Sequence, residues 1–221
     1  MFECTVYDTI AKVAKEYDAT IIAVSKTKPI ADIMTAYQHG IVHFGENKVQ
    51  ELCDKAAQLP KDICWHQIGH LQTNKVKYIA PFIHLIHSVD SIKLLETIDK
   101  EAKKINRTIA ILLQIHIAQE DTKQGFSPDE ILNLYNSNSY KKYNNIHIKG
   151  LMAMATFTDN KEQIAKEFST VKSLFSTIQT NFYTDNKSFS ILSMGMSDDY
   201  TVALANGSNM IRIGSILFGK R

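Results

Sequence analysis

The sequence has little cysteine, little proline and almost no net charge, and each scarcity excludes a class of protein. Its three cysteines form no Cys-x-x-Cys pair, so neither a disulfide framework nor a zinc ribbon is predicted, and no metal site is expected. The net charge of +2 gives no electrostatic reason to expect a nucleic-acid partner. Four scattered prolines and the absence of a Gly/Ser/Pro-rich linker predict a single domain over residues 1–221.

The chain also lacks the patterns that direct a protein to export or to a membrane. Residues 1–17 mix charged with apolar side chains, unlike the basic and apolar regions of a signal peptide. No uncharged apolar run approaches the roughly 20 residues that span a bilayer. We therefore expect a soluble, cytoplasmic protein with no membrane partner.

Short β-rich runs, each followed by a helix-like segment, fill most of the chain. The expected strands are residues 21–25, 41–44, 63–68, 82–86, 109–115, 146–152, 189–192 and 210–213. Apolar spacing of three and four predicts helices over residues 30–38, 47–58, 91–104, 128–135, 161–180 and 198–205. The polar stretch 133–145 is expected to be a surface loop. Alternating strands and helices imply a parallel sheet, and eight such units in about 200 residues fit an α/β fold, a single (β/α)₈ TIM barrel.

An extra amphipathic helix in residues 2–17 is expected to precede the first strand of this barrel. The alternative fold is an open doubly wound sheet. The first strand–helix turn, residues 25–29, lacks the glycine fingerprint with which such sheets bind a dinucleotide, so the barrel is favoured.

Lys26 ends the first expected strand. Barrel active sites lie at the carboxyl ends of the strands, and the two-residue period of a strand places Ile22, Val24 and Lys26 on one face. If that face points into the barrel, burial favours the neutral amine, the nucleophile that forms a Schiff base with an aldehyde or ketone. A lysine at a strand end can also simply extend to water, and its position alone leaves this alternative open.

The seventh and eighth expected strands end in turns rich in glycine and serine, where barrels often bind phosphate. Gly195 and Gly214 let backbone N–H groups approach an anion, and Ser197 and Ser215 add hydroxyl donors where helices start. The alternative is that Ser197 is an ordinary helix N-cap followed by acidic residues of the first turn.

Arg212 lies in an otherwise apolar strand, where its permanent charge requires a partner. A structural salt bridge is one explanation. A hydrogen bond to a pyridine nitrogen is the other, and it gains weight beside an aldehyde-capturing lysine and a phosphate site. These three features together indicate pyridoxal 5′-phosphate.

Seven segments make a family resemblance visible, and they occur at residues 23–29 (AVSKTKP), 44–47 (FGEN), 65–69 (WHQIG), 71–75 (LQTNK), 150–154 (GLMAM), 194–199 (MGMSDD) and 211–214 (IRIG). Through them the chain resembles the pyridoxal phosphate homeostasis protein family, also called the YggS-like or proline synthetase co-transcribed family, over nearly its whole length. The resemblance implies a monomeric barrel similar to the N-terminal domain of alanine racemase.

The resemblance also assigns roles to individual residues. It implies that Lys26 holds the cofactor as an internal aldimine, that Arg212 faces the pyridine nitrogen, and that the phosphate is held by Ser197, Gly214 and Ser215. The residues expected to line the pocket more loosely are Asn47, His66 and Met152, and two further lysines expected at the pocket mouth, to assist cofactor entry or transfer, are Lys28 and Lys123.

Two positions depart from the family pattern. Lys48 stands where the family usually has tyrosine, and His116 where it usually has asparagine. Each could alter the lining of the pocket, although neither is needed for the covalent link or for phosphate binding.

The function expected from these features is reversible cofactor binding without catalysis. An arginine facing the pyridine nitrogen disfavours its protonation and weakens the ring as an electron sink. The chain ends at Arg221, soon after the last expected strand, and we expect no racemase-like β-domain to supply a second acid–base group. We therefore expect storage of pyridoxal phosphate, delivery to apo-enzymes and protection from a reactive aldehyde, with no catalytic residues.

Three alternatives remain open. The first is an amino-acid racemase or related pyridoxal enzyme that uses His66 or Lys123 as its acid–base group. The second is a Schiff-base aldolase in which Lys26 attacks a sugar-phosphate ketone and no cofactor is needed. In the third, purely structural, Lys26 is solvated and the glycine turns are only connections.

Overall fold

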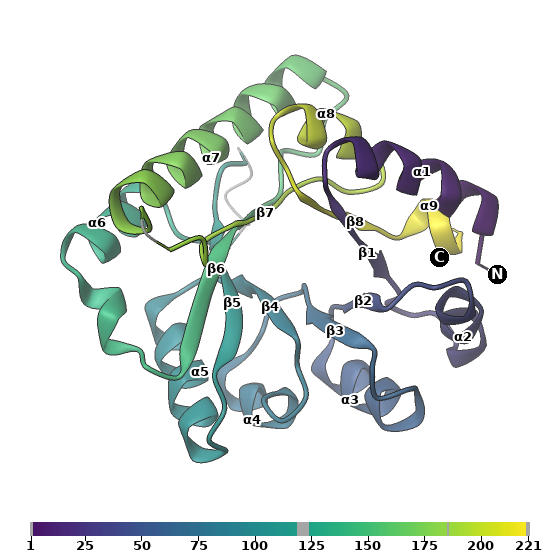
Figure 1. Ribbon diagram of the computed structural model, residues 1–221, viewed down its shortest axis with the longest axis horizontal. Coiled ribbons are helices and arrows are strands. Elements are labelled where there is room, and N and C mark those ends of the chain that lie inside the picture. The colour runs from purple at the N-terminus through teal and green to yellow at the C-terminus, as the bar shows by residue number, and fades with distance from the viewer. Residues whose placement is uncertain (1, 119–123, 185, 220–221) are drawn as a thin grey trace.

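The described residues form a closed barrel of eight parallel strands, in the order in which they occur along the chain. The structure is a computed structural model that describes residues 2–118, 124–184 and 186–219. Figure 1 shows the strands around a common centre with the helices outside them. The prediction of a (β/α)₈ TIM barrel is confirmed.

The strands and helices follow the predicted alternation closely. The strands are β1 Thr20–Val24, β2 His43–Glu46, β3 Cys64–Gln67, β4 Leu85–Val89, β5 Ile109–Ile115, β6 Ile146–Ala153, β7 Ile191–Ser193 and β8 Met210–Ile213. The α-helices are α1 Cys4–Glu16, α2 Ile30–Gln38, α3 Val49–Gln58, α4 Val76–Ile79, α5 Ile92–Lys104, α6 Pro128–Asn136, α7 Lys161–Phe182, α8 Tyr200–Ala205 and α9 Ser215–Phe218, and the 3-10 helices are η1 Thr73–Lys75 and η2 Ser139–Lys142.

Two apolar layers stabilise the barrel. Alternate strand residues point inward, and a small interior cluster is formed by Ile22, Leu85, Leu112, Met152 and Met210. The residues between them point outward: Ala23 and Phe44, for example, join the large core beneath the helices. Because the side-chain period of a strand is two, this register also fixes which residues reach the interior at the strand ends.

The predicted N-terminal helix is α1, and the residues directly before it contact α9 near the other end of the chain. The Glu3 N–H donates to the Leu217 carbonyl at 2.9 Å, and the Phe2 and Phe218 rings pack with their centroids 5.4 Å apart. Figure 1 shows α1 beside α9 where the N- and C-terminal ends meet.

The structure contains three short helices that were not predicted, η1, α4 and α9, and several element ends are shifted by one or two residues. Two segments differ more clearly. Strand β4 begins at Leu85 rather than at residue 82, because the N–H groups of Phe82 and Ile83 bond back to Ile79 at the end of α4. The expected surface loop at 133–145 is partly helical: it contains the end of α6 and all of η2. There Tyr135 is fully buried and packs against Tyr140, with the ring centroids 4.6 Å apart and the rings tilted by 42°, so that aromatic packing orders a stretch that is polar in composition.

Among the described residues, no helix is both long enough and apolar enough to cross a membrane.

Candidate functional site

A cavity of about 970 Å³ opens at the carboxyl ends of the strands. It is lined by Val24, Lys26, Asn47, Ile68, Gly69, His70, Gln114, Gln124, Met154, Phe157, Met196, Ser197, Asp198, Arg212, Gly214 and Ser215. Six of the eight residues expected to bind a cofactor are in this lining, although they come from strands far apart in the sequence. The closed barrel therefore brings most of the candidate site together.

Lys26 reaches the cavity because of the strand register. Ile22 belongs to the interior cluster, and Val24 and Lys26, two and four residues further on, line the cavity above it. The expectation that these three side chains share the inward face is thus met. Lys26 itself is half-buried.

A buried polar network lies behind the Lys26 turn. The Ser25 hydroxyl donates to Glu46 Oε1 at 2.6 Å, and Lys55 Nζ donates to the same oxygen at 2.7 Å and to the Ser25 carbonyl at 2.8 Å. Glu46 is fully buried, and burial raises the pKa of its carboxyl although the bonds from Lys55 and Ser25 oppose that shift. The network fixes the backbone immediately before Lys26.

The same network fixes the backbone immediately after Lys26. Thr27 has a φ of 64°, a left-handed conformation that is strained for a β-branched residue. Its N–H donates to Glu51 Oε1 at 2.6 Å, and Glu51 in turn accepts from Lys55 at 2.6 Å. Lys55 therefore ties together both sides of the turn. The spacing of four between Glu51 and Lys55 on a helix is a signal that could have found this pair.

Two glycine turns approach each other on the other side of the cavity. Gly195 has a φ of 93°, and a Cβ there would lie 2.6 Å from the Ala203 Cβ, so the turn requires glycine. A Cβ at Gly214 would lie 3.1 Å from the Val24 Cβ. The Gly214 N–H donates to the Ser197 hydroxyl at 3.3 Å, which joins the two turns directly.

The backbone of these turns offers donors to an anion. Within the described part of the chain, no acceptor is found for the N–H groups of Ser197, Ser215 and Ile216. Asp199 instead turns back onto its own loop, where its carboxylate accepts from the Met196 N–H at 2.6 Å. Helix α8 begins at Tyr200, with Asp199 rather than Ser197 at its N-cap position and no acidic residue in its first turn, so the alternative of Ser197 as an ordinary N-cap is wrong. The N–H groups at the turns remain available to a phosphate.

Arg212 is anchored by main-chain oxygens rather than by an acid. Its Nη1 donates to the Ser193 carbonyl at 2.9 Å and hydroxyl at 2.8 Å, and its Nη2 donates to the Ala153 carbonyl at 3.1 Å. No carboxylate of the described residues lies within salt-bridge distance of it, so the expected structural salt bridge is not formed. Burial lowers the pKa of Arg212 to about 10, with Asp199 opposing the shift, so the side chain is charged at neutral pH.

Asn47 lies where the loops after β2 and β3 meet. The amide of Gln67 donates to the carbonyls of Asn47 and Gly69, each at 2.9 Å. A Cβ at Gly69 would lie 2.7 Å from the Asn47 backbone, so only glycine permits this approach. The role of Gln67 was not predicted, because an amide inside a strand carries no signal of which loop it will hold.

Other expected site residues lie elsewhere. His66 and Met152 are not in the lining: His66 hydrogen-bonds His87 deeper in the barrel, and Met152 belongs to the interior cluster, because both come from the strand layer below the cavity. Lys28 turns away, donating to the carbonyls of Phe218 and Gly219. Lys123 lies outside the described residues.

Several lining residues were not predicted. Gln114 is almost fully buried and donates to the Gln124 carbonyl at 2.6 Å, while the strongly exposed Phe157 lies at the mouth of the cavity. The two departures from the family pattern, Lys48 and His116, are both absent from the lining.

Comparisons with known proteins agree with this fold. The sequence profile of the family "Alanine racemase, N-terminal domain" matches residues 7–221, which defines the chain as a barrel of that family. A pyridoxal phosphate homeostasis protein of Helicobacter pylori is 39% identical over 207 residues, covering 93% of this chain and 89% of that protein. One from Synechocystis is 37% identical over the full length of both chains. The chain therefore belongs to the pyridoxal phosphate homeostasis protein family, and the resemblance seen in its motifs is confirmed.

Solved structures show the same similarity. PipY of Synechococcus elongatus, solved without pyridoxal phosphate, has a TM-score of 0.87 at 32% identity, with 97% of this chain and 100% of that chain covered. PipY with pyridoxal phosphate bound has a TM-score of 0.85 with the same coverage.

Proposed function

We propose that this protein holds pyridoxal 5′-phosphate covalently on Lys26, in a binding domain that spans residues 1–221, and acts in homeostasis of that cofactor. The observation that carries the proposal is that Lys26, the anchored Arg212 and the two glycine turns face one cavity. PipY, a relative over nearly the whole chain, has been solved with pyridoxal phosphate bound.

The residues of the cavity fit the three chemical groups of this cofactor. Lys26 supplies an amine for the aldehyde, and the N–H groups at Ser197 and Ser215 suit the phosphate. Arg212 lines the cavity, and its bonds to Ser193 and Ala153 use Nη1 and Nη2 rather than Nε. A charged donor suits an unprotonated pyridine nitrogen.

The same arginine argues for storage rather than catalysis. When bound, the cofactor supplies an electron sink, and that sink is strongest when the pyridine nitrogen is protonated. Arg212 keeps its proton at neutral pH, because its pKa is about 10, and so it does not protonate the pyridine nitrogen. The protein therefore holds the cofactor in a chemically muted form, suited to storage and to delivery to apo-enzymes by a monomer.

His66 is poorly placed to serve as the acid–base group of a racemase. It is fully buried outside the cavity lining, and burial together with His87 and His43 lowers its pKa well below 6.5. Protein loaded with pyridoxal phosphate is therefore expected to leave the α-proton of amino acids in place. Incubation with alanine in D₂O, followed by NMR, checks this: sustained deuterium incorporation above a cofactor-only control would show an enzyme.

The aldolase alternative predicts a different result. A protein that retains no cofactor and cleaves a sugar phosphate would be an aldolase.

Arg212→Ala is expected to weaken cofactor binding while keeping the covalent link. Loss of hydrogen bonds from a charged donor costs about 1.5–3 kcal/mol, which corresponds to a roughly 10- to 100-fold rise in Kd. Equilibrium titration followed by visible absorbance measures the change. Arg107→Ala is the matched control, because Arg107 also anchors main-chain carbonyls, those of Ala80 and Ile83, but does not line the cavity. Equal losses in both variants would contradict the role given to Arg212.

A further inference from the structure

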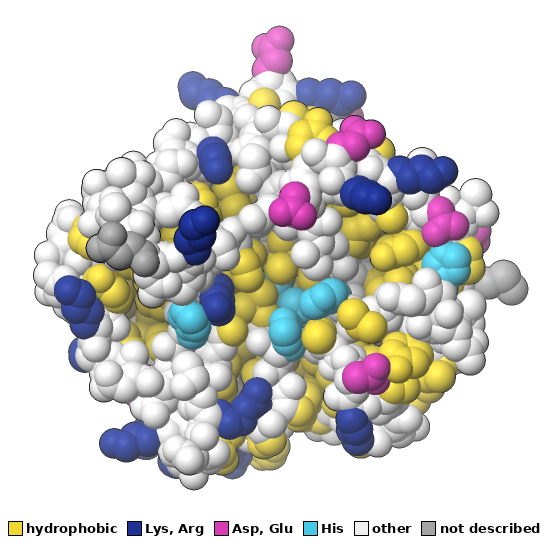
Figure 2. Space-filling model, viewed as in Figure 1, with side chains coloured by type: hydrophobic (Ala, Val, Ile, Leu, Met, Phe, Trp, Pro, Cys, Tyr) yellow, Lys and Arg dark blue, Asp and Glu magenta, His cyan; other side chains and the backbone are white. Residues whose placement is uncertain are grey.

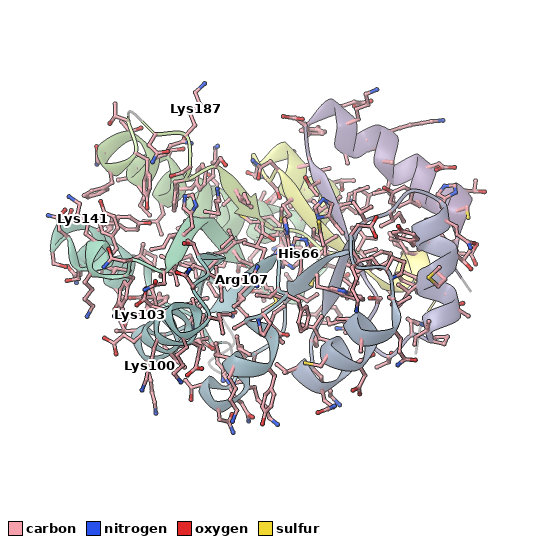
Figure 3. The ribbon with its side chains drawn as sticks, turned by 60° about the horizontal axis from the view of Figure 1, so that its bottom comes forward. His66, Lys100, Lys103, Arg107, Lys141 and Lys187 are labelled. Carbon is pink, nitrogen blue, oxygen red and sulfur yellow. The ribbon has the colours of Figure 1, made fainter. Side chains whose placement is uncertain are left out.

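Three histidine side chains converge at the amino-terminal end of the barrel, opposite the cavity. His43 begins β2, His66 lies within β3, and His84 directly precedes β4. Figure 2 shows histidine side chains gathered in the hollow at the centre of the visible face, and Figure 3 places His66 in the middle of the molecule. None of the three lines the cavity, so the proposed cofactor site leaves them without a role.

The spacing of these imidazoles suits a metal ion. Their ring centroids form a nearly equilateral triangle with sides of 5.2, 5.2 and 5.6 Å, and each ring offers a nitrogen within 4.8 Å of the others. His43 Nδ1 and His66 Nε2 are 3.0 Å apart. Zinc holds imidazole nitrogens at about 2.0–2.1 Å in a tetrahedron, which separates two ligand atoms by about 3.3 Å. Two ligands are therefore nearly in position, and the third belongs to an exposed side chain that can rotate.

The backbone and the surrounding hydrogen bonds hold the inner ligand in place. His66 Nδ1 lies 2.9 Å from His87 Nε2, and His87 Nδ1 lies 3.1 Å from the Ser193 hydroxyl. Metal-binding histidines usually hydrogen-bond through their second nitrogen in this way, which fixes the ring. The His84 backbone is also fixed, since its N–H donates to the Trp65 carbonyl at 2.9 Å.

The electrostatic surroundings favour neutral rings. Burial lowers the pKa of His43, His66 and His84. His84 lowers the pKa of His43 further, and the neighbouring histidines lower that of His66 further. Neutral imidazoles keep the lone pairs that a metal ion requires.

We propose that His43, His66 and His84 bind one Zn²⁺ ion, with water or another ligand in the fourth position. Three imidazoles with an open position suit zinc among divalent ions, since calcium and magnesium prefer oxygen ligands. The inference stands apart from the proposed function, because the site shares no residue with the cofactor cavity.

Calorimetric titration of the full-length protein with ZnCl₂, after dialysis against a chelator, tests the site. We expect one ion per chain, and His84→Ala to weaken binding at least about tenfold. Because His84 is exposed, this variant should retain the fold, as circular dichroism can verify. His147→Ala is the control, because it removes a half-buried histidine near the start of β6 that is not part of the cluster, and it should bind as the unaltered protein does.

Two results would overturn the inference. One is the absence of saturable binding near one ion per chain. The other is an equal loss in His84→Ala and His147→Ala, which would indicate adventitious binding to surface histidines. Co²⁺ gives a second readout: the intense visible bands of a tetrahedral complex should appear and should be lost in His43→Ala, and weak octahedral bands alone would count against the site.

Discussion

Lys26→Ala is expected to abolish covalent binding of pyridoxal phosphate while the protein still folds. The side chain supplies the amine, whereas the backbone on both sides of it is held by Lys55 and Glu51 independently of residue 26. After incubation with the cofactor and borohydride reduction, the unaltered protein should carry one stable pyridoxyl group per chain and the variant none. The change is measured by intact-protein mass spectrometry.

Lys28→Ala is the matched control for this prediction. It removes a lysine two residues away whose amine is bonded to the carbonyls of Phe218 and Gly219. This variant should bind the cofactor covalently as the unaltered protein does. A reducible adduct that persists in Lys26→Ala and disappears in Lys28→Ala would show that the cofactor is attached to Lys28, which would contradict the prediction.

Lys55→Met is expected to cause the largest loss of stability. Methionine keeps much of the length of the side chain but removes its charge. Both the buried Glu46 and the neighbouring Glu51 then lose their cationic partner. Breaking a buried pair in this way costs about 3–5 kcal/mol of the free energy of unfolding. Urea unfolding measures it, and covalent uptake of pyridoxal phosphate should fall in the same variant, because the Ser25 carbonyl and the strained Thr27 lose their support.

Two further variants separate charge pairing from simple packing. Lys61→Met removes an exposed lysine that bonds only helix-end carbonyls, and it should change stability little. The double variant Glu46→Gln with Lys55→Met removes both buried charges and should regain part of the lost stability. A loss below about 1 kcal/mol in Lys55→Met, or no recovery in the double variant, would contradict the role assigned to the network.

Local patterns in the sequence were sufficient to predict the barrel. Period-two strands and three–four-spaced helices are signals carried by neighbouring residues, and α2 and β5 have their predicted bounds. Strand β4 was placed too early because Phe82 and Ile83 look like strand residues, while their hydrogen bonds to Ile79 are visible only in three dimensions. The 133–145 segment was misjudged for the same reason, since its aromatic packing joins distant elements.

The candidate site was predictable where strand ends determine it. Lys26 and Arg212 lie at the carboxyl ends of their strands, and the register carries both to one cavity. The depth of a side chain within the barrel could not be predicted in this way. His66 and Met152 face inward, but they lie in the layer of side chains below the cavity and do not line it. The histidine cluster was not predicted for a related reason, because its members lie in or directly before three different strands and no metal-ligand spacing links them in sequence.

Mapping the lysine that carries the cofactor tests the central claim most directly. The protein is incubated with pyridoxal phosphate, reduced with borohydride and digested, and the modified peptide is sequenced by mass spectrometry. A yellow protein with the pyridoxyl group on Lys26 is the predicted result. A protein that takes up no pyridoxal phosphate, or one modified chiefly at Lys28 or another lysine, would contradict the account.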